Sequence, residues 1–161
     1  MIQTHKLKSG LRVLTIPQKN TRTVTVLVLV GTGSKYEKKR VNGISHFLEH
    51  MFFKGTKKRS TPLDIASPIE NVGGTFNAFT SQDLTGYYIK VDASHLDLAL
   101  DMVADIFLNS LFPLKEIEKE IANLKENNKE LEVKWKNEKQ YIDAIKSSTA
   151  EIDDLKNQAD L

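Results

Sequence analysis

The 161-residue sequence contains no cysteine, which excludes disulfide bonds and thiolate metal sites. Any metal ion must therefore be held by histidine, aspartate, glutamate or asparagine. The longest apolar run, VTVLVLV at residues 24–30, is far shorter than the roughly 20 residues needed to cross a bilayer. The N-terminal MIQTHKLKSG has no apolar stretch typical of a secretory leader. We therefore expect a soluble, cytoplasmic protein with no membrane partner.

Glycine and proline are absent from the last 48 residues, because all eight glycines and all four prolines lie at or before Pro113. That stretch carries nine lysines against eight glutamates and four aspartates, although the whole chain has a net charge of +2. The positive excess therefore lies in the first 113 residues. This change of composition predicts a domain boundary, which we place between residues 1–117 and residues 118–161.

Charge gives little indication of a nucleic-acid partner. A net charge of +2 argues neither for nor against such binding. The two basic KKR triplets, at residues 38–40 and 57–59, are interpreted as solvated loop charges. We therefore expect no nucleic-acid partner.

The first part of the chain mixes strand and helix patterns and predicts an α+β domain, with a mixed or antiparallel sheet packed against helices. Glycine, proline and hydroxyl residues mark the expected ends of these elements, including Gly10 at a bend, Thr61 as one helix cap and Ser94 as another. The expected strands are two within residues 7–16, one at 23–31 buried on both faces, and one strand or a hairpin at 75–91; the expected helices are 43–54, 61–70 and 95–111.

The last part of the chain has a heptad pattern. With Ile121 at position a, six of seven d residues between 117 and 159 are apolar, but only three of six a residues are. The pattern holds for six heptads and predicts a coiled coil or a long paired helix. Asn128 lies at an a position, where a polar side chain can set the register of the two helices. A single amphipathic helix lying on another domain is the alternative. The coiled-coil interpretation predicts helical self-association through residues 117–159.

The pentapeptide HFLEH contains His46, Glu49 and His50. Residues four apart lie on one face of a helix, so the two imidazoles can point at the same ion. A carboxylate beside that face can accept a proton from a metal-bound water, whose pKa zinc lowers to about 7. The order reverses the commoner H-E-x-x-H motif. The alternative is a partly exposed helix with unconnected polar residues.

The residues around this motif resemble a known family. They include Gly33, Ser34, Tyr36 and Glu37 before it, Phe53 to Thr56 after it, and a later set of Gly73, Gly74, Asn77, Ala78, Thr80, Thr85 and Tyr87. Over residues of about 3–120, the sequence resembles the pitrilysin/insulinase/mitochondrial processing peptidase family of zinc proteases. The match is dense and collinear.

The resemblance implies a zinc cofactor and roles for particular residues. His46 and His50 would be zinc ligands, and Glu49 would be the general base that activates the water. Asn77, Ala78 and Phe79 resemble an edge strand that binds the backbone of a peptide or unfolded protein substrate. The alternatives are an ordinary strand-end residue for Asn77 and a core aromatic for Phe79.

The third zinc ligand implied by the resemblance is a glutamate on a later helix. An accompanying glutamate of the family falls on Glu120, but the ligand position itself falls on Asn127. The neutral carbonyl of an asparagine is a poor substitute for a carboxylate on zinc. Glu126 and Glu130 are the nearest alternatives, and neither occupies the same helical position.

A second resemblance covers residues of about 118–161. KELEVKWKNEKQYIDAI, residues 129–145, resembles the coiled-coil middle domain of ClpB-type disaggregases. Together the two resemblances imply a partial pitrilysin-type domain followed by a long helical arm. We expect a zinc metalloendopeptidase that is truncated and impaired in this chain. The alternative is a non-catalytic peptide-binding scaffold with a coiled-coil interaction arm.

Overall fold

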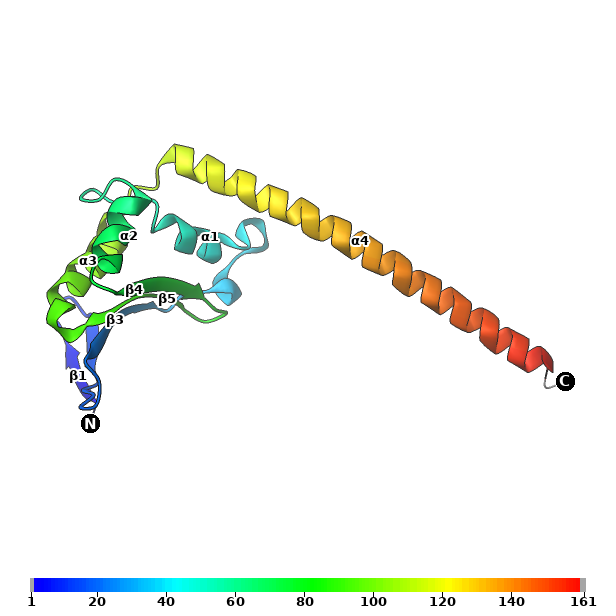
Figure 1. Ribbon diagram of the computed structural model, residues 1–161, viewed down its shortest axis with the longest axis horizontal. Helices are drawn as coiled ribbons and strands as arrows, with labels where there is room; N and C mark the ends of the chain where they lie inside the picture. Colours follow the sequence, from blue (N-terminus) through cyan, green and yellow to red (C-terminus); the bar gives the residue numbers. More distant parts are fainter. Residues whose placement is uncertain (1, 160–161) are drawn as a thin grey trace. The chain divides into compact units, whose positions relative to one another are not determined.

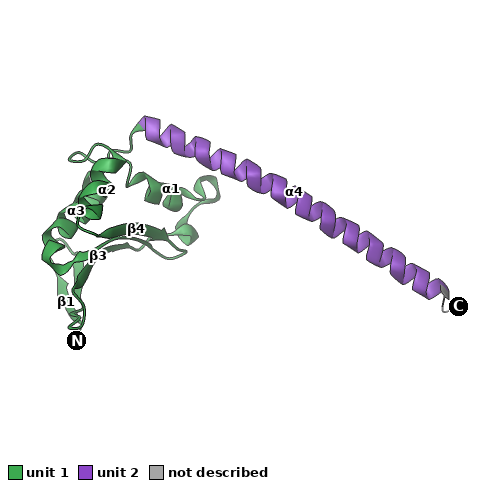
Figure 2. Ribbon diagram, viewed as in Figure 1, with its two compact units in different colours: residues 1–113 green, residues 114–161 purple. Residues whose placement is uncertain are grey.

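The computed structural model describes residues 2–159 and divides into two compact units, residues 1–113 and residues 114–161 (Figure 2). The expected α+β fold followed by a long C-terminal helix is confirmed. The assignment of domains to residues 1–117 and 118–161 stays a prediction. Across residues 2–159, the helices are too short or too polar to qualify as membrane spans.

The described part of the first unit contains two antiparallel sheets and three α-helices (Figure 1). One sheet is the hairpin β1–β2, and the other has the strand order β3-β5-β4. The elements are β1 (Gln3–Lys6), β2 (Arg12–Thr15), β3 (Thr23–Val30), α1 (Ile44–Met51), α2 (Pro62–Glu70), β4 (Thr75–Thr80), β5 (Thr85–Asp92) and α3 (Leu96–Asn109).

The first hairpin begins earlier in the chain than expected. Residues 7–10 form the turn rather than a strand, and the amide of Gly10 donates to the carbonyl of Leu7 at 2.9 Å. Gly10 has a φ of +90°, a conformation that glycine adopts without steric cost. The bend is therefore at the expected glycine, but the first strand lies earlier in the chain, at Gln3–Lys6.

The expectation that the strand at residues 23–31 is buried on both faces is wrong. Within the described residues, β3 pairs with β5 alone, and its side chains alternate between half-buried and exposed. Val26 packs against the core, whereas Leu27 and Leu29 are 45% and 53% exposed. The strand has one covered face because α1, α2 and α3 lie on the same side of the sheet (Figure 1).

The core of the first unit lies between the three-stranded sheet and these helices. Ile65 and Ile69 from α2 and Met102 from α3 are fully buried, and they cluster with Ile89 and Val91 from β5. Burying side chains of this size contributes about 1.5–3 kcal/mol each relative to exposure. This core fixes β5 at the centre of the sheet, with β4 beside it.

Local capping signals were predicted correctly for α2 but not for α3. Thr61 caps α2 as expected, in a capping box in which Asp64 also accepts the Thr61 amide at 3.0 Å. Ser94 does not cap α3. Instead Asp92 accepts bonds from the Ser94 amide at 3.0 Å and the Ser94 hydroxyl at 2.7 Å, and a 3-10 turn precedes the helix.

The interpretation of residues 57–59 as solvated charges is wrong for Arg59. Its guanidinium donates to Asp105 and Asp101 on α3, both at 2.6 Å, and its side chain is only 16% exposed. The buried Thr56 hydroxyl also donates to Asp105 at 2.6 Å. This ion-pair network joins the loop after α1 to α3.

The second unit is one continuous helix, α4 (Leu114–Ala159), which spans 46 residues. Apolar heptad residues on it are exposed, with Leu131 at 62%, Trp135 at 58% and Ile145 at 65%. A long helix with these side chains in water is what a paired helix requires of each partner. Self-association through residues 117–159 stays a prediction.

Candidate metal centre

The helix that carries HFLEH is anchored at its N-terminus by Glu37. The Glu37 carboxylate accepts hydrogen bonds from the amides of Gly43 at 2.6 Å and Ser45 at 2.8 Å. These amides belong to the first turn, where backbone donors have no partner within the helix. The bonds from Ser45 and Gly43 hold the pKa of Glu37 below its ordinary value. Glu37 therefore fixes where α1 begins.

The two histidines of α1 converge. His46 Nε2 and His50 Nε2 lie 3.1 Å apart, and the two rings meet edge to face with centroids 4.6 Å apart. Two nitrogens bound tetrahedrally to one zinc ion, each at about 2.0–2.1 Å, would lie about 3.3 Å apart. The observed pair is close to that spacing, so the donor set fits as two ligands of one ion.

Glu49 lies beside this pair and contacts the sheet. The Thr80 hydroxyl, at the end of β4, donates to Glu49 Oε2. Burial, and to a lesser degree the negative charge of Glu49, raises the pKa of Tyr87 on β5 to about 12. The Glu49 carboxylate thus contacts the sheet at the end of β4 and lines one cavity with His50.

The expected substrate-binding residues lie on β4, which pairs with β5 along one side only among the described residues. Asn77 and Phe79 are exposed, and Ala78 is half-buried. The Asn77 side-chain oxygen accepts the amide of Ala78 at 2.8 Å. Phe79 is 40% exposed and covers Gly86, where an added Cβ would collide with its ring.

A shallow cavity of about 280 Å³ joins α1 to β4. It combines the acidic and imidazole groups of the motif with the amide of Asn77 and two aromatic rings. The lining residues are Glu49, His50, Phe53, Lys54, Phe76 and Asn77. An extended peptide lying along β4 would therefore pass beside the histidine pair.

Within the first unit, the candidate metal-binding groups are His46, His50 and the neighbouring Glu49. Among residues 2–159, groups of three or more histidine, aspartate or glutamate side chains that could hold a metal ion are absent. The first unit therefore offers two candidate ligands and a neighbouring carboxylate. The roles of His46, His50 and Glu49 stay predictions.

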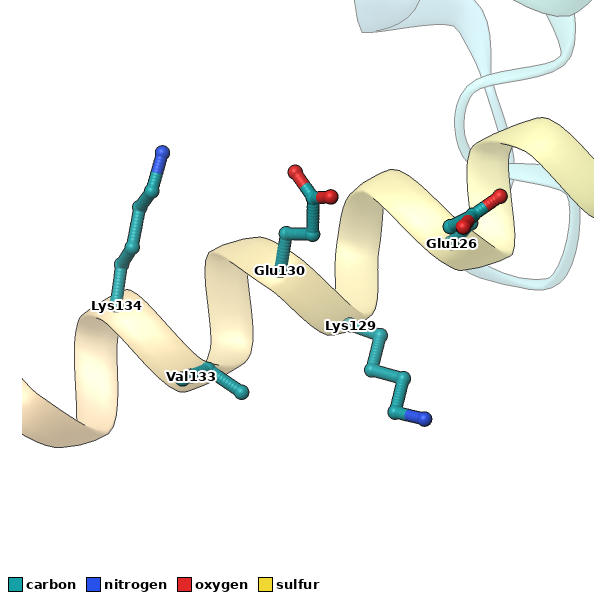
Figure 3. A pocket seen from close by; sticks show the side chains of 5 residues that line it. All are labelled: Glu126, Lys129, Glu130, Val133 and Lys134. Atoms are coloured by element: carbon teal, nitrogen blue, oxygen red, sulfur yellow. The ribbon is translucent and has the colours of Figure 1, made fainter.

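The candidates for the third ligand, Glu126, Asn127 and Glu130, lie on α4. Figure 3 shows Glu130 and Lys134 projecting from one side of the helix, and Lys129 and Val133 from the other. These residues and Glu126 line a hollow made by a single helix. Its carboxylates, Glu126 and Glu130, are interspersed with Lys129 and Lys134 along the helix.

Two positioning contacts were missed at the level of sequence. Glu37 and Thr80 are among the residues that carry the family resemblance, but no local pattern predicts a role for either. Glu37 precedes Gly43 by six residues, and Thr80 follows Glu49 by 31, so neither contact follows a local spacing rule. Only the fold brings these side chains to α1.

Comparison with known proteins identifies the family of this chain. The sequence model of the family described as Insulinase (Peptidase family M16) matches residues 12–159. Because that match covers most of the chain, the chain belongs to the insulinase family of peptidases. The match extends along α4, and the resemblance of residues of about 118–161 to a chaperone middle domain stays a prediction.

Individual relatives match between 71% and 74% of the chain. The chain is 45% identical over 120 residues to the uncharacterized zinc protease YmxG of Bacillus subtilis, covering 74% of this chain and 29% of that protein. It is 47% identical over 114 residues to the mitochondrial-processing peptidase subunit beta of Dictyostelium discoideum, covering 71% of this chain and 24% of that subunit.

A solved structure shares the fold. A protease from Helicobacter pylori matches with a TM-score of 0.74 and 33% identity, covering 79% of this chain and 30% of that chain. The chain therefore spans less than a third of the length of each of these three relatives.

Proposed function

We propose that the first unit is the zinc- and peptide-binding part of a metalloendopeptidase that hydrolyses peptide bonds through a zinc-activated water. His46 and His50 would hold the ion, and Glu49 would accept a proton from the attacking water. Asn77, Ala78 and Phe79 bind the peptide backbone as an added strand along β4. The observation that carries the proposal is the 3.1 Å separation of His46 Nε2 and His50 Nε2 beside the Glu49 carboxylate.

Membership of the insulinase family supports the same chemistry. The relatives named above include a zinc protease and a processing peptidase subunit. Zinc, when bound, supplies a water acidic enough to give hydroxide near neutral pH. The chain's own residues would hold the ion at His46 and His50, accept a proton at Glu49 and align the peptide along β4. With two histidine ligands, the chain holds zinc more weakly than a complete site would, and its turnover is impaired.

A second candidate function is peptide binding without hydrolysis. It is favoured by the open edge of β4 and by the exposed apolar side chains of α4 in the described part of the chain. In this reading β4 holds a peptide while α4, with its exposed Leu131 and Trp135, serves as an interaction arm. Both candidates share the peptide-binding strand and differ in whether the bound peptide is cut.

Metal removal distinguishes the two candidates. The purified chain is stripped with a chelator and mixed with an unstructured fluorogenic peptide, before and after addition of zinc. We expect slow hydrolysis that appears only with zinc and is lost in His46→Ala. His5→Ala is the matched control, because His5 is an exposed histidine on β1.

The result decides between three outcomes. Zinc-dependent cleavage that needs His46 supports the peptidase. Cleavage that survives metal removal contradicts it. Peptide binding without cleavage, weakened by changes on β4, supports the second candidate.

A further inference from the structure

Glu49 is attached to the sheet through one side chain, that of Thr80. The Thr80 hydroxyl donates to Glu49 Oε2, so one oxygen of this carboxylate is held by the last residue of β4. Thr80 is the last residue of β4, on the same half-buried face as Phe76 and Ala78. The strand that would carry a peptide therefore ends at the carboxylate that would act on it.

The turn after Thr80 is itself fixed to the loop that anchors α1. The amides of Ser34 and Lys35 donate to the carbonyls of Ser81 and Gln82, each at 3.1 Å. Gly33 lies so close to this turn that an added Cβ would be 2.7 Å from the Gln82 oxygen. Only glycine fits this contact without displacing backbone.

The same loop leads directly to the cap of α1. Three residues after Ser34, Glu37 accepts the Gly43 and Ser45 amides and fixes the start of the helix. A closed ring of contacts therefore runs from the N-terminus of α1, through residues 33–37 and the β4–β5 turn, to Thr80, and back to α1 at Glu49. The N-terminus of α1 and Glu49 on the same helix are therefore both connected to the β4–β5 turn.

We propose that Thr80 is a positioning residue, which holds the Glu49 carboxylate beside the histidine pair and couples it to the peptide-binding strand β4. This inference rests on the proposed function for its catalytic meaning. A glutamate side chain has several rotatable bonds, and a fixed carboxylate avoids the search for the productive rotamer. Loss of the hydroxyl should slow the proton transfer without changing how the ion or the peptide binds.

A double-mutant cycle tests the contact without requiring hydrolysis. The urea midpoints of the full chain are measured for Thr80→Val, Glu49→Ala and the double variant. We expect the urea midpoint of the double variant to fall by clearly less than the sum of the falls in the two single variants, because each single change already removes the same hydrogen bond. The matched control pairs Glu49→Ala with Thr75→Val, a threonine at the exposed start of the same strand, and should be additive.

Additive shifts for Thr80 and Glu49 would overturn the proposal. The cycle gives this answer even if the chain cuts no peptide, so its failure is distinct from failure of the proposed function. Where zinc-dependent hydrolysis is measured, Thr80→Val should lower kcat by about 10-fold to 100-fold with KM unchanged, and Thr80→Ser should restore it. A rise in KM with kcat unchanged would instead assign Thr80 to peptide binding and would also overturn the proposal.

Discussion

The Glu49→Gln variant is expected to hydrolyse an unstructured peptide about 100-fold to 10,000-fold more slowly than the parent chain at the same zinc concentration. A positioned general base contributes a factor of this size, and glutamine has the shape of glutamate but cannot accept the proton. Zinc binding should be unchanged, because His46 and His50 remain. Initial rates of cleavage and a zinc titration of both proteins measure the two quantities.

Glu70→Gln provides the matched control for this experiment. Glu70 is an exposed glutamate at the end of α2 and lies outside the cavity beside α1. Its replacement should leave both cleavage and zinc binding as they are. Cleavage by Glu49→Gln at the parental rate would contradict the role of Glu49 as the base.

Replacing Asp105 with alanine is expected to lower the free energy of unfolding of the first unit by about 3–5 kcal/mol. Asp105 is 1% exposed and accepts bonds from Thr56 and Arg59, both at 2.6 Å. Its removal leaves a largely buried guanidinium and a buried hydroxyl without this acceptor. Urea denaturation of the full chain, followed by circular dichroism, measures the loss.

Asp101→Ala is the control on the same helix. Asp101 also binds Arg59, at 2.6 Å, but its side chain is 46% exposed. Exposed ion pairs contribute about 0–1 kcal/mol, so the variant should remain close to the parent. If Asp105→Ala and Asp101→Ala lowered the free energy of unfolding equally, the claim that the buried aspartate contributes more than the exposed one would be contradicted.

The contribution of Asp105 should also depend on pH. Burial alone would raise its pKa, but hydrogen bonds from Thr56, Asn109 and Arg59 outweigh this effect and place the pKa below the ordinary value of 3.8. The unfolded chain therefore takes up the proton at a higher pH than the folded chain does. The stabilisation is present above about pH 4 and is lost as the pH falls through the folded-state value. The parent and Asp105→Asn should therefore differ less in free energy of unfolding at acidic pH than at neutral pH, which urea denaturation at the two pH values measures.

Features set by nearby residues could be predicted from the sequence. The helix around HFLEH, the Thr61 cap and the long α4 all follow from local spacing and capping rules. The convergence of His46 and His50 follows from their separation by four residues. These parts of the fold and of the site needed no knowledge of distant contacts.

Features set by distant residues could not be predicted in this way. The apolar composition of β3 gives no indication that one of its faces is open, because that depends on which side of the sheet the helices cover. Arg59 lies in a basic triplet, and its pairing with Asp105 depends on how the loop meets α3. The bond from Thr80 to Glu49 likewise exists only once β4 lies beside α1.

The most direct test of the central claim is a calorimetric zinc titration of the metal-stripped chain, with His50→Ala measured in parallel. The claim is that His46 and His50 form one metal site on α1. We predict that the parent binds one zinc ion per chain and that His50→Ala abolishes this binding, while the exposed-histidine variant His5→Ala keeps it. Zinc binding that is unaffected by His50→Ala, or absent from the parent, would contradict the claim.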